Sequence, residues 1–555
     1  NPSTCILKPV EGAFDALPVA KCTQRAWWAA LAKLHAPAGP AWTMDGDDHL
    51  QLIATLEEIK ACWRCVLRHS GCRTADAYTG SLEDVLGEGS PDLPSATMTL
   101  LQTHALKTGM GAPSPGPVCP LCLGSLQEEP HADGEASLPS ASLQPAVQAV
   151  VDKYEVPVGQ GFSLDVSLPA AAAVRARAMA VRHPGACAGA YVDLKEALRL
   201  RFTPPLEAVL GTSCAPGAGL RLTLALSAPG VAGEGAWLAQ GIQQQVDQSR
   251  RRRHTGKRRH GKQDIVPADA MVASARLVDQ LAALTPAAFL SACPASAASL
   301  APPPAPATLG LRACRAPFHL GGRYTKLGRD IPQSPWFIDG ERRGGVSLEE
   351  RLAAVVLPGL RCSDASFLSS GREDMDVRML GTGRPWALEL RDAGRAPPDH
   401  GACLDLERGI NEAEAGRVGV RGLRVLTPAE VAAIKAEDGD REKSYVALCW
   451  APRPVGEQEV AQLEARQGLV IKQQTPMRVL HRRANLVRPR TVVCMRVRSV
   501  PSSSCFLLGL RTQSGTYVKE FVHGDLGRTV PCLGDLLGMP VTILQLDVMD
   551  IHMDF

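Results

Sequence analysis

The sequence predicts an α/β protein with more than one domain. Stretches that alternate between apolar and polar residues, as half-buried strands do, occur in both halves of the chain, at 162–168 and 491–500. Between them lie stretches with apolar residues at helical spacing, such as 47–68 and the alanine-rich 170–181. Because one hydrophobic core rarely supports more than roughly 250 to 300 residues, the 555 residues of this chain require several domains.

The composition is that of a globular protein, with 45% hydrophobic residues, while 51 Gly and 43 Pro indicate long insertions between compact parts. The formal net charge of +3 means that a polyanion-binding surface has to come from local clustering of the 60 Lys and Arg. No apolar run reaches the ~18 residues needed to cross a bilayer, so we expect a soluble protein of the nucleus, the cytoplasm or both, with no membrane partner. The chain begins at Asn1, and a missing organellar leader therefore stays an open alternative.

Two C-x-x-C knuckles near the N-terminus predict a metal site. The pairs are Cys62 with Cys65 and Cys119 with Cys122. This spacing lets two thiolates of one turn point at one ion, and two such turns complete a tetrahedral site. Seventeen cysteines, an odd number spread along the chain, argue against a disulfide framework. We predict structural Zn2+ on these four thiolates; redox dithiols are the alternative, and Cys72 is a spare thiol nearby.

The first predicted region is 1–142, a helical region built around this zinc site. Residues 47–68 read as one amphipathic helix that the first knuckle ends. Residues 82–106 are predicted to be helical as well, and 127–142 form a polar linker.

The second predicted region, 143–296, is an α/β accessory domain with strands at 162–168 and 220–226 and a helix at 170–181. It contains the densest charge run of the chain, 250–262. A solvated insertion, a phosphate-contacting arm and a nuclear-import signal are all consistent with such a run.

A proline-rich linker at 297–309 is predicted to be the main domain boundary, and 310–555 the C-terminal domain. There, 321–336 combines aromatic and basic side chains in what we expect to be a glycine-bearing loop that grips RNA, with an ordinary surface loop as the alternative. Residues 442–450 are predicted to form a strand. Residues 471–500 contain eight Arg and Lys and no acid, which predicts a positive wall along a substrate cleft.

The turn Gly371-Arg372-Glu373-Asp374 is the strongest candidate for a reactive site. Five of the seven residues 372–378 are ionisable, between a small-residue turn and an apolar, strand-like run. Neighbouring arginines lower the pKa of an aspartate, and an ionised aspartate can act as nucleophile or general base. A solvated turn between strands is the alternative interpretation.

These motifs resemble the family-ten tRNA pseudouridine synthases of archaea and eukaryotes. The resemblance rests on the 371–374 turn, the string at 321–336, T-P-x-R-V-L-H-R-R at 475–483 and G-T-Y-x-K at 515–519, and it covers about residues 318–548. It implies a pseudouridine synthase fold for the C-terminal domain, with a mixed antiparallel sheet flanked by helices and loops. It also implies that the accessory domain is a THUMP-like RNA-binding domain.

The resemblance implies specific residue roles. Asp374 would be the catalytic aspartate and Lys519 the cation that keeps it ionised, with Asp376 as the competing carboxylate; catalysis would need no cofactor. Tyr445 would stack on a flipped-out uracil and Tyr517 would line the base pocket. The other substrate-binding residues implied are Arg372, Lys519, Arg323, Tyr324, Arg478 and Arg482.

The implied function is isomerisation of uridine to pseudouridine in the T-loop of tRNA by a monomer. Attack of the aspartate on the sugar and a glycal route both stay open. One alternative is a catalytically silent RNA-binding scaffold. The other is a different THUMP-containing RNA-modifying enzyme, such as a methyltransferase, which would need a Gly-rich methyl-donor loop that we do not find in the sequence.

Overall fold

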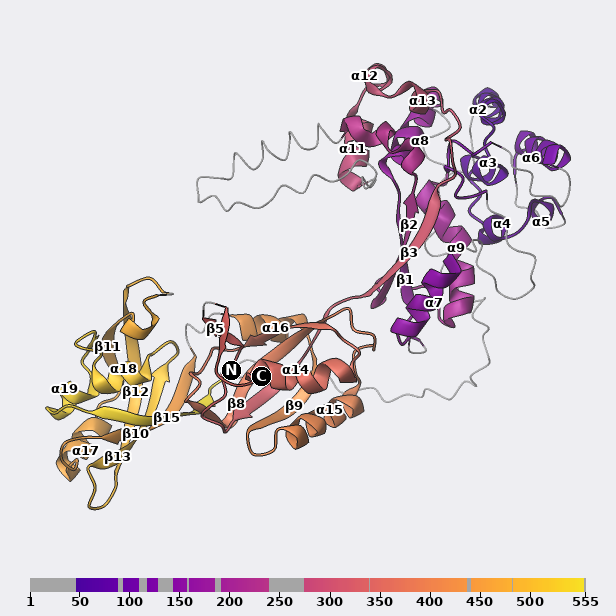
Figure 1. The fold of residues 1–555 in the computed structure, drawn as a ribbon. Coiled ribbons are helices and arrows are strands. Elements are labelled where there is room, and N and C mark those ends of the chain that lie inside the picture. Colours follow the sequence, from indigo (N-terminus) through magenta and orange to yellow (C-terminus); the bar gives the residue numbers. More distant parts are fainter. Residues whose placement is uncertain are drawn as a thin grey trace, which may run out of the picture.

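The computed structural model describes residues 46–87, 93–108, 117–127, 143–156, 159–184, 191–238, 274–338, 340–436, 441–481 and 483–553. These residues form two domains, an accessory domain and a C-terminal domain, seen at the upper right and lower left of Figure 1. One hydrophobic core contains residues from Leu52 to Leu309 and the other residues from Phe318 to Ile551. The predicted α/β class is confirmed. None of the helices in these ranges is long and apolar enough to span a bilayer.

Three strands make the sheet of the accessory domain, in the order β1 (Phe162–Ser167), β2 (Leu220–Ser227) and β3 (Thr308–Arg315). β1 runs parallel to β2, and β3 is antiparallel to β2. Leu164 and Leu222 are among the alternate residues of these strands that are buried, so the alternation in the sequence has its expected cause. The helical and 3-10 elements of this domain are α2 (Gly46–Glu58), α3 (Trp63–His69), α4 (Ala75–Thr79), α5 (Leu82–Leu86), α6 (Ser95–Thr108), α7 (Gln144–Lys153), α8 (Ala170–Arg182), α9 (Leu194–Leu210), η2 (Pro229–Val231), α11 (Ala275–Ala283), α12 (Pro286–Ala292) and α13 (Ala295–Ala298).

The single helix predicted for 47–68 is two helices. α2 ends at Glu58, Lys60 has a left-handed φ of 54°, and the chain re-enters a helix after Cys62, the N-cap of α3. Re-entry one residue after Cys62 puts Cys62 and Cys65 in one tight turn, because Cys65 is in the first turn of α3. The metal-binding spacing therefore prevails over continuous helical periodicity. The basic run 250–262 and residues 128–142 of the predicted linker lie outside the described residues.

The proline-rich stretch 297–309 is not a free linker but packs onto the accessory domain. Arg175 Nη1 donates to the Ala301 carbonyl at 2.7 Å, and the Ala307 amide donates to the Leu123 carbonyl at 2.7 Å. The following strand, β3, completes the accessory sheet, so the boundary lies at residues 316–317 rather than at 297–309. The division predicted at residue 142 also does not separate two cores, since one core spans it.

The C-terminal domain is built on a ten-stranded sheet with the order β14-β11-β12-β13-β10-β15-β8-β4-β9, in which β7 also pairs with β8. Its pairings are antiparallel except that between β15 and β8. That parallel contact involves only Asp547 with Arg378 and Val548 with Met379. It joins two halves of the sheet, each with its own helices (Figure 1).

The predicted mixed sheet with flanking helices is confirmed, and β10 begins and ends where the sequence predicted a strand. The strands of this domain are β4 (Phe318–Lys326), β5 (Trp336–Ile338), β6 (Glu341–Arg343), β7 (Asp364–Ser369), β8 (Arg378–Arg391), β9 (Val418–Leu426), β10 (Glu442–Trp450), β11 (Leu469–Gln474), β12 (Val487–Ser499), β13 (Cys505–Gln513), β14 (Thr529–Val530) and β15 (Thr542–Ile551). The helical elements are α14 (Leu348–Gly359), α15 (His400–Ala413), α16 (Pro428–Lys435), α17 (Glu457–Glu464), η4 (Met477–Val479), α18 (Val518–His523) and α19 (Leu533–Leu537).

The loop predicted for 321–336 is wrong in its first part, because residues up to Lys326 belong to β4 between β8 and β9. The two glycines have a packing reason. A Cβ on Gly321 would collide with the Trp386 carbonyl, and one on Gly322 would collide with the Arg421 carbonyl. Glycine here allows β4 to pack closely between β8 and β9. Glycine is common in loops but also occurs in strands where another backbone approaches closely, so its presence does not distinguish the two.

Candidate active site and metal centre

The turn that carries Asp374 lies between β7 and β8, directly before the parallel contact of β8 with β15. Gly371 has a φ of +81°, a conformation that residues with a Cβ rarely adopt, so glycine is required for the chain to reverse here. Asp374 therefore sits where the two halves of the sheet meet. Residues from both halves can reach it.

Two cations from the second half of the domain contact the Asp374 carboxylate. Arg478 Nη1 lies 3.2 Å from each carboxylate oxygen, and Lys519 Nζ lies 3.3 Å from Oδ2. The Asp374 side chain is 37% exposed, so it is reachable from solvent. The carboxylate is therefore open to solvent and in contact with two cations.

Lys519 is shared between two carboxylates. Its Nζ is 2.9 Å from Asp376 Oδ2, closer than to Asp374. Burial raises the pKa of Asp376, but the hydrogen bond and charge of Lys519 lower it more, and the net shift is downward. Asp376 is the more exposed of the two acids, with 62% of its side chain accessible. The geometry makes it an anchor for Lys519.

Arg478 is held by a second acid that the sequence reasoning missed. Its Nε donates to Glu520 Oε1 at 2.7 Å, and the Glu520 side chain is only 3% exposed. Its guanidinium carbon lies 5.9 Å from the centre of the Tyr517 ring. Burial lowers the pKa of Arg478, and Glu520 with Asp374 raises it to a net upward shift. Arg478 is thus a fixed cation beside Asp374.

Tyr517 is half-buried at the start of α18, where its backbone is bound on both sides by one amide side chain. The Tyr517 amide donates to Gln473 Oε1 at 2.8 Å, and Gln473 Nε2 donates to the Tyr517 carbonyl at 2.9 Å. Tyr445 is half-buried in β10, directly across from Val548 of β15. Burial lowers the pKa of the buried Arg384, but the charges of Glu373, Tyr324 and Tyr445 raise it, and the net shift is upward. Tyr445 thus lies near enough to interact with the charge of Arg384.

Two predicted substrate-binding residues lie elsewhere. Tyr324 is fully buried and donates its hydroxyl to Glu373 at 3.0 Å, so its ring cannot meet a base from solvent, contrary to expectation. Arg323, the preceding residue of β4, points to the opposite face of the sheet because successive strand residues alternate. It donates to the Gly383 and Met553 carbonyls and lines a cavity of about 720 Å³ with Arg421.

Arg372 is exposed on the turn. Arg482 lies outside the described residues. The predicted positive wall is therefore only partly described: its Arg478 contacts Asp374, while Arg488 donates to the Thr475 hydroxyl at 3.1 Å.

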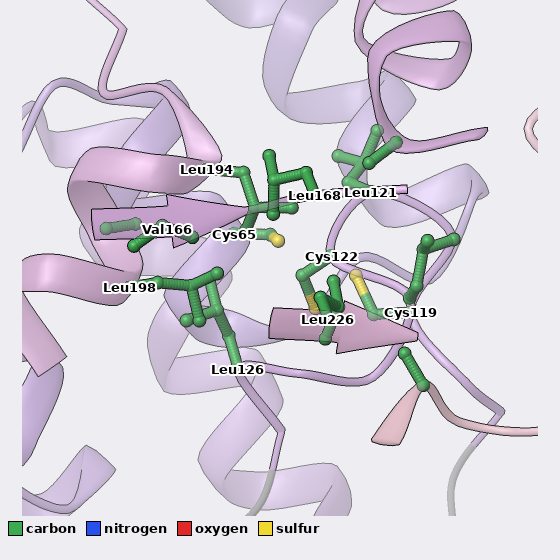
Figure 2. Packing of buried hydrophobic residues seen from close by; sticks show 14 of the residues in the cluster. Cys65, Cys119, Leu121, Cys122, Leu126, Val166, Leu168, Leu194, Leu198 and Leu226 are labelled. Atoms are coloured by element: carbon green, nitrogen blue, oxygen red, sulfur yellow. The ribbon is translucent and has the colours of Figure 1, made fainter. Parts of the chain in front are cut away.

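The four knuckle cysteines come together in the interior of the accessory domain. Their sulfur atoms all lie within 4.8 Å of one another, and every one of the residues is buried. Figure 2 shows Cys65, Cys119 and Cys122 surrounded by leucines of α9, β2 and the second knuckle. The Cys62 and Cys122 sulfurs are 3.7 Å apart. A tetrahedron with Zn–S bonds of about 2.3 Å has an edge of about 3.8 Å, so the set fits one tetrahedral ion.

Two further groups donate hydrogen bonds to sulfur atoms of the cluster. Arg68 Nε donates to Cys65 Sγ at 3.4 Å, and the Cys62 amide donates to Cys119 Sγ at 3.3 Å. Four thiolates around a divalent ion carry a net charge of about −2, which the buried Arg68 partly balances. Cys72 lies outside the group and contacts the Thr74 hydroxyl instead.

Comparison with known proteins finds a family model that is similar to the C-terminal domain. Residues 319–552 match the family model described as "Pus10, C-terminal". The resemblance expected from the motifs is confirmed for these residues. The matched range includes the Asp374 turn, Arg478 and Lys519, and it does not include the four cysteines of the metal centre.

Curated relatives named tRNA pseudouridine synthase Pus10 occur in eukaryotes and archaea. The Mus musculus protein is 41% identical over 236 residues, covering 42% of this chain and 44% of the relative. The Homo sapiens protein is 39% identical over 249 residues, covering 45% and 47%. The Thermofilum pendens protein is 36% identical over 239 residues, covering 43% and 53%. In these matches the chain spans about half the length of its relatives.

Among solved structures, this chain is similar to one titled "Crystal Structure of a Cbf5-Nop10-Gar1 Complex". The identity is 17% and the TM-score 0.23, covering 41% of this chain and 58% of that one.

Proposed function

We propose that this protein is a tRNA pseudouridine synthase that isomerises uridine to pseudouridine in the T-loop of tRNA, with Asp374 as its one catalytic aspartate. The observation that carries the proposal is the half-exposed Asp374 carboxylate, 3.2 to 3.3 Å from Arg478 and Lys519. These residues lie in the region that matches the Pus10 family. The relatives' name supports the substrate class.

The reaction is a redox-neutral isomerisation. The N1–C1′ bond of uridine breaks, the base turns within the pocket, and a C5–C1′ bond forms. The hydrogen on C5 leaves as a proton and N1 gains one, so atoms and electrons balance without an oxidant, a reductant or an energy source. Asp374 starts the reaction, either by attack on C1′ or by removal of a sugar proton that leads to a glycal. Both routes require its carboxylate to be charged and held in place, and Arg478 and Lys519 contact it at 3.2 and 3.3 Å.

The target uridine has to leave its stack before Asp374 can reach C1′. Extrusion of a nucleotide costs a few kcal/mol. Stacking on Tyr445 and contact with Tyr517 offset this cost by roughly 1 to 3 kcal/mol for each aromatic contact. Arg372, exposed on the turn beside Asp374, holds the extruded nucleotide. The accessory domain, a THUMP-like module in this proposal, binds the body of the RNA, and the protein works as a monomer.

The four-cysteine cluster binds structural Zn2+ in this proposal. Cys62, Cys65, Cys119 and Cys122 would be its ligands, and the ion would tie α3 to the second knuckle. A cluster that is fully buried and ringed by leucines offers no open position for a substrate. The zinc therefore belongs to folding, and the isomerisation is independent of it.

The experiment compares Asp374→Asn with Asp376→Asn on an unmodified tRNA transcript labelled with tritium at C5 of uridine. Release of tritium measures pseudouridine formation directly. Asp374→Asn should abolish release while RNA affinity stays within about twofold of wild type. Asp376→Asn should retain a reduced rate, because it loosens Lys519 but leaves the Asp374 carboxylate intact.

Transcripts in which single T-loop uridines are replaced by cytidine would locate the target, since only one or two of these replacements should remove the tritium release.

Two outcomes refute the proposal. A substantial rate in Asp374→Asn would remove that residue from catalysis. Tight RNA binding by a wild-type protein that releases no tritium from any tRNA would identify an RNA-binding scaffold instead.

A further inference from the structure

The Asp374 turn rests on a buried cluster of charged residues that do not contact solvent. Lys326 and the side chains of Glu373 and Arg384 are 0%, 1% and 2% exposed. Arg384 Nε donates to Glu373 Oε2 at 2.9 Å, and Lys326 Nζ lies 3.9 Å from Glu373 Oε1. Lys326 and Arg384 come from β4 and β8, so the cluster joins the turn to the central strands of the sheet.

Lys326 binds the backbone of the turn. Its ammonium donates to the carbonyls of Asp374 at 3.0 Å and Met375 at 3.2 Å, and to the Ile331 carbonyl at 2.9 Å. These contacts use all three of its donors. Burial lowers the pKa of Lys326, and the charge of Glu373 opposes this shift without cancelling it.

Glu373 binds the other side of the same turn through its partners. Arg384 Nη1 donates to the Ser370 carbonyl at 2.6 Å. The Tyr324 hydroxyl, which donates to Glu373, accepts a hydrogen bond from Gln333 Nε2 at 2.9 Å. That same amide donates to the Gly371 carbonyl at 3.2 Å. Carbonyls before and after Asp374 are therefore held by side chains that converge on one buried carboxylate.

Stability alone does not account for this arrangement. Apolar residues of similar volume often replace a buried ion pair at no cost to stability, because desolvation of the charges offsets their attraction. The charged groups instead fix the backbone of the turn, because each donor binds one particular carbonyl. We propose that Glu373 and Lys326 are positioning residues that hold the Asp374 carboxylate in its reactive orientation. This inference rests on the proposed role of Asp374.

The test is Glu373→Gln, measured by steady-state kinetics of tritium release and by thermal unfolding. The matched control is Glu234→Gln in the accessory domain. Glu234 is also buried and also binds an arginine: its two oxygens each lie 2.7 Å from Arg175 nitrogens. It lies far from the turn in sequence, in the accessory domain. Both variants lose the charge of a buried, arginine-bound carboxylate.

Glu373→Gln should lower kcat on the order of 100-fold, the effect expected when a reacting group is misplaced by about 1 Å. The KM for tRNA should stay within twofold, because Glu373 does not face solvent. Glu234→Gln should lower the melting temperature to a similar degree and leave kcat unchanged at a temperature where both variants are folded. Tyr324→Phe, which removes one hydroxyl under the turn, is the milder variant if Glu373→Gln does not fold, and it should lower kcat without a change in KM.

An unchanged kcat in Glu373→Gln or Tyr324→Phe would overturn the inference, as would an equal loss of kcat in Glu234→Gln. The Asp374→Asn variant distinguishes failure of the positioning role from failure of the proposed function. If it is inactive while Glu373→Gln is fully active, only the positioning role fails. If it is active, the proposed function itself fails.

Discussion

Asp392 is predicted to hold the two domains at a fixed angle, and Asp392→Ala should loosen their junction. Asp392 belongs to the C-terminal domain, directly after β8. Its carboxylate accepts hydrogen bonds from the Tyr154 hydroxyl at 2.6 Å and the Arg315 amide at 3.0 Å, and it pairs with Lys153. All three partners belong to the accessory domain: Lys153 and Tyr154 lie at the end of α7, and Arg315 is the last residue of β3.

The magnitude follows from the exposure of the partners. Hydrogen bonds to a charged group contribute about 1.5 to 3 kcal/mol each, and the contacts with Tyr154 and Arg315 are partly buried. The Lys153 side chain is 51% exposed, so its pairing adds less, at most about 1 kcal/mol. Loss of the carboxylate should weaken the junction by about 4 kcal/mol. Arg315 would remain as a second link through the Ala393 carbonyl at 2.9 Å.

The assay compares a full-length tRNA with a short T-arm stem-loop. Asp392→Ala should raise the KM for tRNA about tenfold, because the accessory domain no longer presents a fixed surface, and leave the KM for the stem-loop unchanged. Small-angle X-ray scattering should show a larger radius of gyration. Asp364→Ala is the control: Asp364 pairs with Arg391 within the C-terminal domain, and its side chain is 61% exposed.

The pH dependence gives a second measurement on the wild type. Burial raises the pKa of Asp392, but Lys153, Tyr154 and the Arg315 amide lower it further, to a net downward shift. A carboxyl whose pKa is lower in the folded protein than its unfolded value of about 3.9 stabilises above that value and loses its contribution as pH falls through the folded pKa. Only as pH falls through the folded pKa, which lies below about 3.9, should the wild type come to resemble Asp392→Ala. An unchanged scattering profile and KM in the variant would refute this account of the junction.

Two other predictions follow from the two sites. Lys519→Met removes a cation 3.3 Å from Asp374 and 2.9 Å from Asp376. The kcat should fall at least tenfold, because Lys519 no longer holds the two carboxylates in place. Lys472→Met, at an exposed lysine of β11, is its control, and equal losses of kcat in the two variants would contradict the pairing. Cys119→Ser, or a strong chelator, should unfold the accessory domain, since structural zinc contributes on the order of 10 kcal/mol. The C-terminal domain, which has its own core, should keep its melting transition and its activity on the stem-loop, and a purified protein without bound metal would refute the prediction.

Features of the structure could be predicted from the sequence where a few neighbouring residues determine them on their own. The knuckle spacing predicts a metal site because two residues between cysteines fit one turn, and the buried cluster of Cys62, Cys65, Cys119 and Cys122 has the expected dimensions. Strand β10 was predictable in full from its β-branched and aromatic residues. Asp374 could be identified as a candidate site because ionisable residues surround it at 372–378, and such a cluster is uncommon in a hydrophobic core.

The partners of Asp374 depend on the tertiary structure. Lys326 resembles any surface lysine in the sequence, and only the packing of β4 between β8 and β9 buries it under the turn. Arg323 and Tyr324 are neighbours in the chain, yet strand alternation sends one to each face of the sheet. The proline-rich stretch has the composition of a linker, but contacts from Arg175 and Leu123 hold it against the accessory domain.

The sequence by itself therefore determined the chemistry that is available, namely four thiolates in two turns and a carboxylate beside basic residues. The tertiary structure decided which of the many charged side chains meet. The reason is physical: a charge acts over a few ångströms in space, and residues 374, 478 and 519 come within that distance only when the sheet closes across its one parallel contact.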